Sequence, residues 1–126
     1  MDSKTLASKA RKIIKNIHFY GVLPAHQLPV EIRRFPSGFI ANTHTSSGNG
    51  QHWVLFYWNS RGDGYFFDSY GQSPSANGHE HWEEYLKRNS RYYWSFNKRR
   101  VQAYATKLCG PYCLGFLYLK SRYSRV

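Results

Sequence analysis

The first hydrophobic pattern in the chain has a helical period. From Ser3 to Ile17, apolar residues recur every three or four positions, and lysine and arginine occupy most of the positions between them. This spacing predicts an amphipathic helix with the Ser3 hydroxyl as its N-terminal cap. From His18 to Pro36, by contrast, one glycine and three prolines interrupt the chain, so we expect a loop there.

Four later runs have the length and composition of β-strands. The run HWVLFYWN, His52 to Asn59, is apolar on both faces, which is typical of a central strand. A turn, SRGDG, joins it to YFFDSY, Tyr65 to Tyr70, so the two runs form a predicted hairpin. Further strands are expected at GFIANT, Gly38 to Thr43, and at RYYWSF, Arg91 to Phe96.

Two further segments are predicted to be helices. HEHWEEYLKRNS, His79 to Ser90, places three large apolar side chains on one side of a helix, namely Trp82, Tyr85 and Leu86. Gly110 to Tyr123 carries Pro111 in its first turn, where proline is tolerated. Because most of this last segment is apolar, it predicts a buried helix.

Together these elements predict the α+β class, with one domain over residues 1–126, a mostly antiparallel central sheet and helices packed on it. The chain's 126 residues are enough to bury a core without disulfide bonds. Hydrophobic residues make up 41% of the chain and aromatic residues 18%, which excludes a disordered polypeptide. No apolar run approaches the roughly 18 residues of a membrane span, and Lys and Arg recur where a signal peptide would be apolar. We therefore expect an intracellular protein with no membrane segment.

The net charge of the chain indicates which classes of molecule it can bind. Eighteen Lys and Arg against seven Asp and Glu give a formal net charge of +11. Such a surface attracts polyanions, and non-specific binding of nucleic acid is the first candidate. A solvated basic face without a specific ligand explains the same composition, and no nucleic-acid-binding motif accompanies the charge.

The two cysteines, Cys109 and Cys113, lie in KLCGPYCLGFLYLK at the start of the last predicted helix. A disulfide between them is rejected, because four-residue spacing in a helix gives poor disulfide geometry and an intracellular compartment disfavours the bond. A zinc site is also disfavoured, because the C-x3-C pair lacks the regular second ligand pair of such sites. The histidines that would have to complete one are His44, His52, His79 and His81.

Each cysteine has its own interpretation. Cys113 lies one turn into an apolar helix, and we expect its side chain to be buried and to pack in the core. Cys109 immediately precedes Gly110, where unsatisfied backbone N–H groups and the helix dipole favour a thiolate. Because the glycine leaves room for a substrate carbonyl beside the sulfur, Cys109 is the candidate nucleophile.

A nucleophilic cysteine needs a base, and His52 with Asp68 is the candidate pair. His52 opens the first strand of the predicted hairpin and Asp68 lies near the end of the second, so the two meet at one edge within a residue or two of register. An acid among so many aromatic residues would need a partner. The alternatives are a strand-edge histidine and a turn-capping aspartate with no shared role, and the cysteine downstream favours the pair.

The order His52, Asp68, Cys109 resembles the adenovirus-type cysteine endopeptidases, which share a wider grouping with the SUMO-specific proteases. The matching motifs are GQHWVLFYWN, YFFDSYG and LCGPYCLGFLYL. The resemblance implies the fold of that grouping, with the nucleophile at the N-terminus of a buried helix. It also implies that His52, held by Asp68, activates Cys109, and that Gln102 forms an oxyanion hole with the backbone N–H of Cys109. Trp53, next to the histidine, is expected either to pack against the catalytic groups or simply to belong to the core.

The resemblance also bears on activators. The chemistry that it implies needs no metal and no other cofactor. The adenovirus enzymes are stimulated by DNA and by a viral peptide that is tethered through a disulfide to a further cysteine. This chain has no third cysteine, so the covalent tether is not carried over, whereas DNA or an untethered peptide stays a candidate activator. The acid is aspartate, as in the SUMO-specific branch.

Three functions are compatible with these residues, and we favour the first. It is a cysteine endopeptidase of viral type that cleaves viral precursor or structural proteins, as a monomer in the infected-cell nucleus or in the virion. The second is a protease of ubiquitin-like modifiers, with the same chemistry. The third is a non-catalytic, basic nucleic-acid-binding protein in which the three residues coincide by chance.

Overall fold

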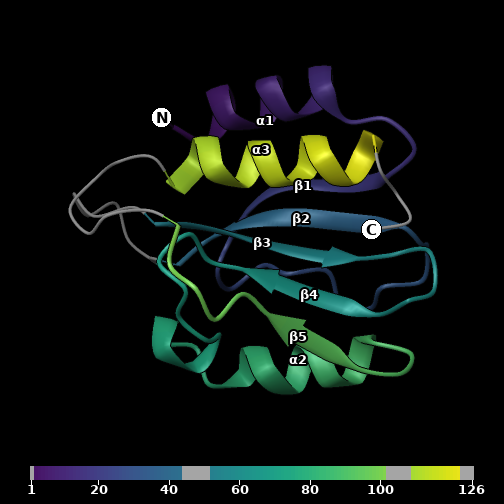
Figure 1. Ribbon diagram of the computed structural model, residues 1–126, viewed down its shortest axis with the longest axis vertical. Helices are drawn as coiled ribbons and strands as arrows, with labels where there is room; N and C mark the ends of the chain where they lie inside the picture. Colours follow the sequence, from purple (N-terminus) through teal and green to yellow (C-terminus); the bar gives the residue numbers. More distant parts are fainter. Residues whose placement is uncertain (1, 44–51, 102–108, 123–126) are drawn as a thin grey trace.

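The chain folds into three layers, with a five-stranded sheet between two layers of helices (Figure 1). The computed structural model describes residues 2–43, 52–101 and 109–122. Helices α1 (Ser3–Ile13) and α3 (Cys109–Arg122) lie side by side on one face of the sheet, and α2 (His81–Asn89) covers the other. A short 3₁₀ turn, η1, precedes α2 at Ser75–Asn77. The strands are β1 (His18–Pro24), β2 (Ser37–Asn42), β3 (Trp53–Trp58), β4 (Gly64–Phe67) and β5 (Trp94–Phe96).

The strands follow sequence order across the sheet, and their directions are mixed. Strands β2, β3 and β4 pair in antiparallel fashion, whereas β1 is parallel to β2 and β5 is parallel to β4. Parallel neighbours need a crossover connection, and the chain passes from β4 to β5 through η1 and α2. The predicted α+β class with helices packed on the sheet is confirmed. The predicted antiparallel pairing applies to the centre of the sheet, and the two edge strands run parallel to their neighbours.

Strand β1 corrects the loop predicted at His18 to Pro36. Gly21 adopts a φ of 118° at a shift of register within the strand, and Pro24 is the last strand residue. An edge strand tolerates both features, because one side of its backbone has no partner in the sheet. Glycine and proline therefore mark an irregularity and a strand end here, and not an uninterrupted loop.

Helix α1 also differs from its prediction at both ends. It ends earlier than expected, at Ile13, because Ile14 already has an extended backbone, with φ −80° and ψ 128°, and Asn16 then takes a φ of 63°, which a right-handed helix cannot include. At the other end Asp2, and not Ser3, is the cap: its carboxylate accepts a hydrogen bond from the N–H of Thr5 at 2.8 Å.

The central strands are buried on both faces, as the run HWVLFYWN predicts. Alternate residues of β3 point to opposite sides of the sheet, and each side belongs to its own hydrophobic cluster. On the α2 side the sheet residues of the cluster are Phe39, Ala41, Val54, Phe56, Trp58 and Phe66. On the α1 and α3 side they are Ile40, Trp53, Leu55, Tyr57 and Phe67, and the two cysteines pack against them. Strand β3, which His52 immediately precedes, is therefore the most deeply buried strand of the sheet.

Helix α3 is buried on one face only, which corrects the predicted buried helix. Cys109, Cys113 and Leu117 recur every four residues and face the sheet. Apolar residues also occur on the other sides of this helix, but the sheet and α1 cover just one of them within the described ranges. Three large side chains are consequently exposed, namely Tyr112, Tyr118 and Leu119. None of the helices in the described part of the chain has the length and apolar run that crossing a bilayer requires.

Candidate active site

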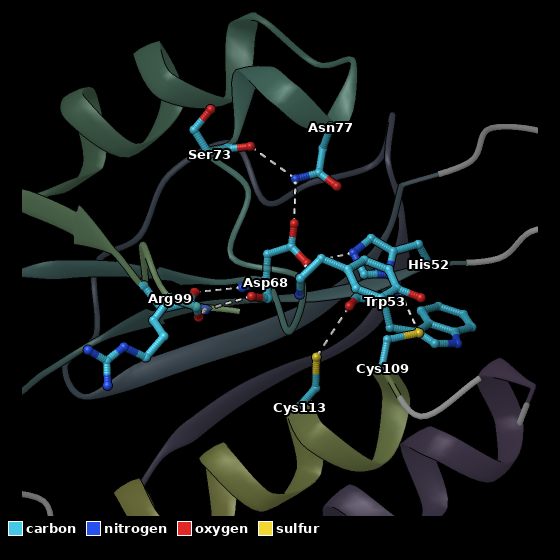
Figure 2. Close-up of polar contacts among 10 residues, drawn as sticks. His52, Trp53, Asp68, Ser73, Asn77, Arg99, Cys109 and Cys113 are labelled. Carbon is cyan, nitrogen blue, oxygen red and sulfur yellow. Dashed lines mark hydrogen bonds and ion pairs between the residues drawn. The ribbon is translucent and has the colours of Figure 1, made fainter. Parts of the chain in front are cut away.

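His52 and Asp68 form a buried, hydrogen-bonded pair at the end of the β3–β4 hairpin (Figure 2). His52 immediately precedes β3, and Asp68 immediately follows β4. Leu55 pairs with Phe67 in the hairpin, so the continued register places Asp68 opposite Val54, two residues from His52. The Nε2 atom of His52 lies 2.8 Å from Oδ1 of Asp68, and the two side chains are 12% and 0% exposed. The structure thus brings the two residues together as the hairpin register predicts.

Two neighbouring groups satisfy the carboxylate of Asp68. Its Oδ1 atom also accepts a hydrogen bond from the backbone N–H of Tyr70 at 2.9 Å, and its Oδ2 atom accepts one from the side-chain amide of Asn77 at 3.1 Å. The ring of Tyr70 stacks on the imidazole of His52 with 4.7 Å between ring centroids. The carboxylate and the imidazole are therefore both held in a fixed orientation.

A third residue, Asn97, fixes the backbone at Asp68. Its side-chain oxygen accepts from the N–H of Asp68 at 2.9 Å, and its side-chain nitrogen donates to the carbonyl of Asp68 at 2.6 Å. Neither Asn77 nor Asn97 was expected at the site from the sequence, and of the residues around Asp68 only Tyr70 falls in one of its motifs, YFFDSYG. Asparagines outside periodic segments carry no pattern, so nothing in the sequence singles these two out.

The environment shifts the pKa values of both members of the pair. Burial alone lowers the pKa of His52, but the hydrogen bond to Asp68, the neighbouring Cys109 sulfur and the charges of both raise it from 6.5 to about 9. Burial alone raises the pKa of Asp68, but the hydrogen bonds and positive charge around it outweigh this effect and lower it. At neutral pH the imidazole is therefore protonated and the carboxylate is ionised.

Cys109 is the first residue of α3 and lies beside this pair (Figure 2). Its side chain is buried, and Sγ accepts a hydrogen bond from the backbone N–H of Trp53 at 3.4 Å. The Nδ1 atom of His52 is buried with no hydrogen-bond partner among the described residues. The Cys109 thiol is nevertheless close enough to His52 for each group to perturb the pKa of the other. Catalytic hydrogen bonds are commonly longer in the absence of substrate and shorten when it binds.

The pKa of the Cys109 thiol is lowered. Burial alone raises it, but His52 and the backbone N–H groups of Trp53 and Gly110 favour the thiolate by a larger amount. A cysteine of lowered pKa beside a histidine of raised pKa shares its proton with that histidine. The arrangement can therefore hold a thiolate–imidazolium pair at neutral pH.

Cys113 has the opposite character. It is fully buried, and complete burial raises the pKa of its thiol well above 9.0, so it stays protonated. Its thiol donates to the carbonyl oxygen of Trp53 at 3.5 Å, and neither cysteine forms a disulfide. The expected packing role of Cys113 is confirmed. Trp53 is part of the core and also contacts both sulfur atoms through its backbone.

Gln102, the expected oxyanion-hole residue, lies outside the described residues. The chain is anchored immediately before it, because the N–H of Val101 donates to the carbonyl of Ser69 at 2.8 Å. Gly71 permits this close approach: its φ is 76°, and a Cβ atom there would lie 2.7 Å from the backbone nitrogen of Arg100. The segment that leads to Gln102 therefore runs directly beside the strand end that carries Asp68.

The histidines considered as zinc ligands are distributed differently. His44 lies outside the described residues, and His52 is hydrogen-bonded to Asp68. The ring of His79 stacks on Trp82 with 4.2 Å between centroids and its Nε2 lies 2.6 Å from the carbonyl of Thr43. In residues 2–43, 52–101 and 109–122, no group of three or more His, Cys, Asp or Glu side chains is arranged to hold a metal ion.

No protein-family model and no curated protein sequence matches the chain. Among solved structures, the chain is similar to the crystal structure of the selenomethionine form of the ASFV pS273R protease, with 29% sequence identity and a TM-score of 0.51. The similarity covers 71% of this chain and 35% of that protease, so the chain spans about a third of the neighbour's length. It does not single out the adenovirus-type branch. The fold is that of a SUMO-protease-like cysteine protease, and the likeness supports a peptidase function.

Proposed function

We propose that the chain is a cysteine endopeptidase in which Cys109 is the nucleophile, His52 is the acid–base and Asp68 orients the imidazole. The observation that carries the proposal is the arrangement at the start of α3, where a thiol of lowered pKa lies beside a histidine held by a buried carboxylate. A His–Asp pair buried for structural reasons alone would not require such a thiol next to it. The likeness to a solved protease supports the same reaction class.

In the resting site the proton of Cys109 resides on His52, because the pKa of the thiol is lowered and that of the imidazole is raised. The thiolate attacks the scissile carbonyl carbon, and the π electrons of the carbonyl move onto its oxygen. The backbone N–H of Cys109 and the side-chain amide of Gln102 bind this oxyanion. A donor of this kind is worth about 3–4 kcal/mol in the transition state.

The imidazolium then gives its proton to the leaving amine as the C–N bond breaks, which leaves a thioester on Cys109 and a neutral His52. The neutral imidazole takes a proton from water, whose oxygen attacks the thioester carbonyl. Collapse of this second intermediate releases the carboxylic acid product and restores the thiolate–imidazolium pair. Asp68 stays ionised throughout, and its hydrogen bond to Nε2 leaves Nδ1 of His52 available to the sulfur.

Within this proposal the substrates are viral precursor or structural proteins, cleaved next to small residues such as glycine in the infected-cell nucleus or the virion. The motif order of the chain and its likeness to the ASFV pS273R protease support a viral processing role. The chain acts as a monomer, and DNA or an untethered peptide is its candidate activator. The net charge of +11 supports attraction to DNA.

The proposal is tested by cleavage and by thiol titration. Purified wild type, Cys109→Ala, His52→Ala and Cys113→Ala are incubated with virion precursor proteins, with and without DNA, and only wild type and Cys113→Ala should cleave. The rate at which iodoacetamide alkylates Cys109 should show that the thiolate forms below pH 9 in wild type and that the thiol is ordinary in His52→Ala. Equal cleavage by wild type and Cys109→Ala, or an ordinary thiol in wild type, contradicts the proposal. An ordinary thiol with strong, salt-dependent nucleic-acid binding would favour the non-catalytic alternative.

A protease of ubiquitin-like modifiers is a second candidate, and the SUMO-protease-like fold is the observation that favours it. A modifier whose C-terminal glycine carries a vinyl sulfone should then form a covalent adduct with Cys109. Wild type that cleaves virion precursors but forms no adduct with any modifier would reject this candidate and keep the first.

A further inference from the structure

An apolar groove of about 610 Å³ runs along the exposed flank of helix α3, and we call it the α3 groove. Helix α3 forms one wall, and Phe67 of β4 and Val101 form the other. Four of its large side chains are each at least 36% exposed: Val101, Tyr112, Tyr118 and Leu119. Gly115 leaves the middle of the groove open, because a Cβ atom there would meet nothing within 4 Å. A gathering of exposed apolar side chains in one hollow is typical of an interaction site.

Described cations lie on two sides of this groove. No Asp or Glu occurs in residues 85–126, so the chain from Val101 onward, which supplies all of the lining except Phe67, brings no acidic side chain to the groove. Lys120 lies 5.3 Å from the ring centroid of Phe116, and Arg122 lies 5.3 Å from that of Tyr118, and both rings line the groove. The opposite wall ends at Val101, which directly follows the exposed Arg99 and Arg100.

We propose that the α3 groove is a docking surface for an acidic segment of a partner polypeptide that carries apolar side chains. The apolar side chains of such a segment would fill the hollow, and its carboxylates would meet the cations along the rim. A second copy of this chain fits less well, because it would bring the same cations against the groove. Nucleic acid offers the right charge, but its phosphates and polar base edges do not match the apolar walls of this groove. The proposal stands apart from catalysis, because neither Cys109 nor His52 lines the groove.

The probe is a library of random twelve-residue peptides displayed on phage and selected against the immobilised full chain. Selected sequences should combine several Asp or Glu residues with Leu, Phe or Trp. Labelled versions of these peptides should bind wild type and Cys109→Ala equally in fluorescence polarisation, which separates this proposal from the proposed protease function. Selection of peptides without acidic residues overturns it.

Groove variants locate the binding site. Leu119→Ser removes an exposed apolar contact, and Gly115→Leu fills the open middle, so each should weaken binding at least about tenfold. The matched control is Val30→Ser, which removes an even more exposed apolar side chain elsewhere and should leave binding unchanged. Arg122→Gln should weaken binding several-fold and flatten its salt dependence, whereas Arg34→Gln, also at an exposed arginine, should not.

Three results would overturn the proposal. The first is binding that is the same in Leu119→Ser and Gly115→Leu as in wild type. The second is displacement of the peptide by oligothymidine whose own affinity falls in Leu119→Ser, which would assign the groove to single-stranded nucleic acid. The third is a concentration-dependent dimer in sedimentation that Leu119→Ser abolishes, which would assign it to a second copy of the chain.

Discussion

The side-chain amide of Asn77 donates a hydrogen bond to Oδ2 of Asp68 at 3.1 Å, while the other carboxylate oxygen, Oδ1, holds His52 at 2.8 Å (Figure 2). The same nitrogen of Asn77 donates to the carbonyl of Ser73 at 3.0 Å, so the amide is fixed on both sides. Because Asp68 is fully buried, its Oδ2 atom cannot exchange this donor for bulk water. Asn77 is therefore a positioning residue, which acts on Cys109 through Asp68 and His52.

Removal of this donor should slow the reaction. A hydrogen bond to a buried charge is worth about 1.5–3 kcal/mol, so Asn77→Ala should lower kcat by roughly tenfold or more. Asn77→Asp keeps the shape of the side chain but sets a second carboxylate against Asp68, and it should be slower than Asn77→Ala at neutral pH. A purely structural role predicts the reverse order, because the isosteric variant preserves packing. Alkylation rates of Cys109 against pH provide a readout that needs no substrate.

The pairing of His52 with Asp68 could be predicted because a hairpin joins the two residues. The register of an antiparallel pair follows from a short turn, and the two residues lie only two positions out of register. Asn77 and Asn97 could not be predicted, because their places depend on the crossover through η1 and α2 and on the pairing of the short edge strand β5. Such long-range placement leaves no periodic pattern in a single sequence.

The same distinction explains the errors in the fold. Strand β3 could be predicted from its apolar run because both of its faces are buried. Helix α2 could be predicted because its buried residues share one side. Strand β1 is an edge strand that contains Gly21 and ends at Pro24, so local rules favour a loop, and only its pairing with β2 makes it a strand. Helix α3 is apolar all round, and composition alone does not tell which of its sides the fold leaves uncovered.

The two cysteines should differ sharply in reactivity. Cys109 has a lowered pKa and Cys113 a raised one, so iodoacetamide at pH 7 should alkylate Cys109 alone in the native protein. Cys113→Ala should keep cleavage activity within a few-fold and lower the free energy of unfolding by about 1 kcal/mol, since it removes one buried sulfur and its hydrogen bond to Trp53. Mass spectrometry after alkylation and urea denaturation check the two expectations. Labelling of Cys113 at a comparable rate would contradict its burial.

The shifted pKa values of His52 and Cys109 predict how stability depends on pH. The pKa of His52 is raised from 6.5 to about 9, so its contribution is complete below pH 6.5 and is lost as the pH rises toward 9. The pKa of Cys109 is lowered from 9.0, so its contribution is complete above pH 9 and is lost as the pH falls through the folded value. At pH values above 6.5 and above the folded pKa of Cys109 but below 9, the folded state holds one proton more on His52 and one fewer on Cys109 than the unfolded state does. As the pH rises, the His52 contribution lowers the free energy of unfolding and the Cys109 contribution raises it, so wild-type stability should change little in this pH range.

Cys109→Ala should remove that compensation. The free energy of unfolding of this variant, relative to wild type, should fall as the pH rises from 6.5 through the folded pKa of His52, by up to about 1.4 kcal/mol per pH unit. That pKa is lower in the variant than in wild type, because the contribution of Cys109 to it is gone. Urea denaturation at several pH values measures the difference. Cys113→Ala serves as the control, because it retains both titrating groups and should parallel wild type. A Cys109→Ala profile parallel to wild type would contradict the opposed pKa shifts.

Gly71 should be needed for the approach of the segment that precedes Gln102. Both Gly71 and Gly78 have left-handed φ values, 76° and 85°, but a Cβ atom on Gly71 would lie 2.7 Å from the backbone of Arg100, whereas one on Gly78 would meet nothing within 4 Å. Gly78→Ala should therefore cost only the backbone strain of about 1–2 kcal/mol. Gly71→Ala should cost that strain and at least about 1 kcal/mol more from the clash.

The two variants should also differ in activity. In Gly71→Ala the backbone of Arg100 must move away, which strains the hydrogen bond from Val101 to Ser69 and shifts the chain immediately before Gln102. Cleavage should fall well below that of Gly78→Ala, while iodoacetamide still alkylates Cys109 at a rate close to wild type, because alkylation needs no oxyanion hole. Equal cleavage by the two variants would show that the contact at Arg100 is not required. Slow alkylation in Gly71→Ala would show instead that the displaced segment disturbs His52 and Asp68 themselves.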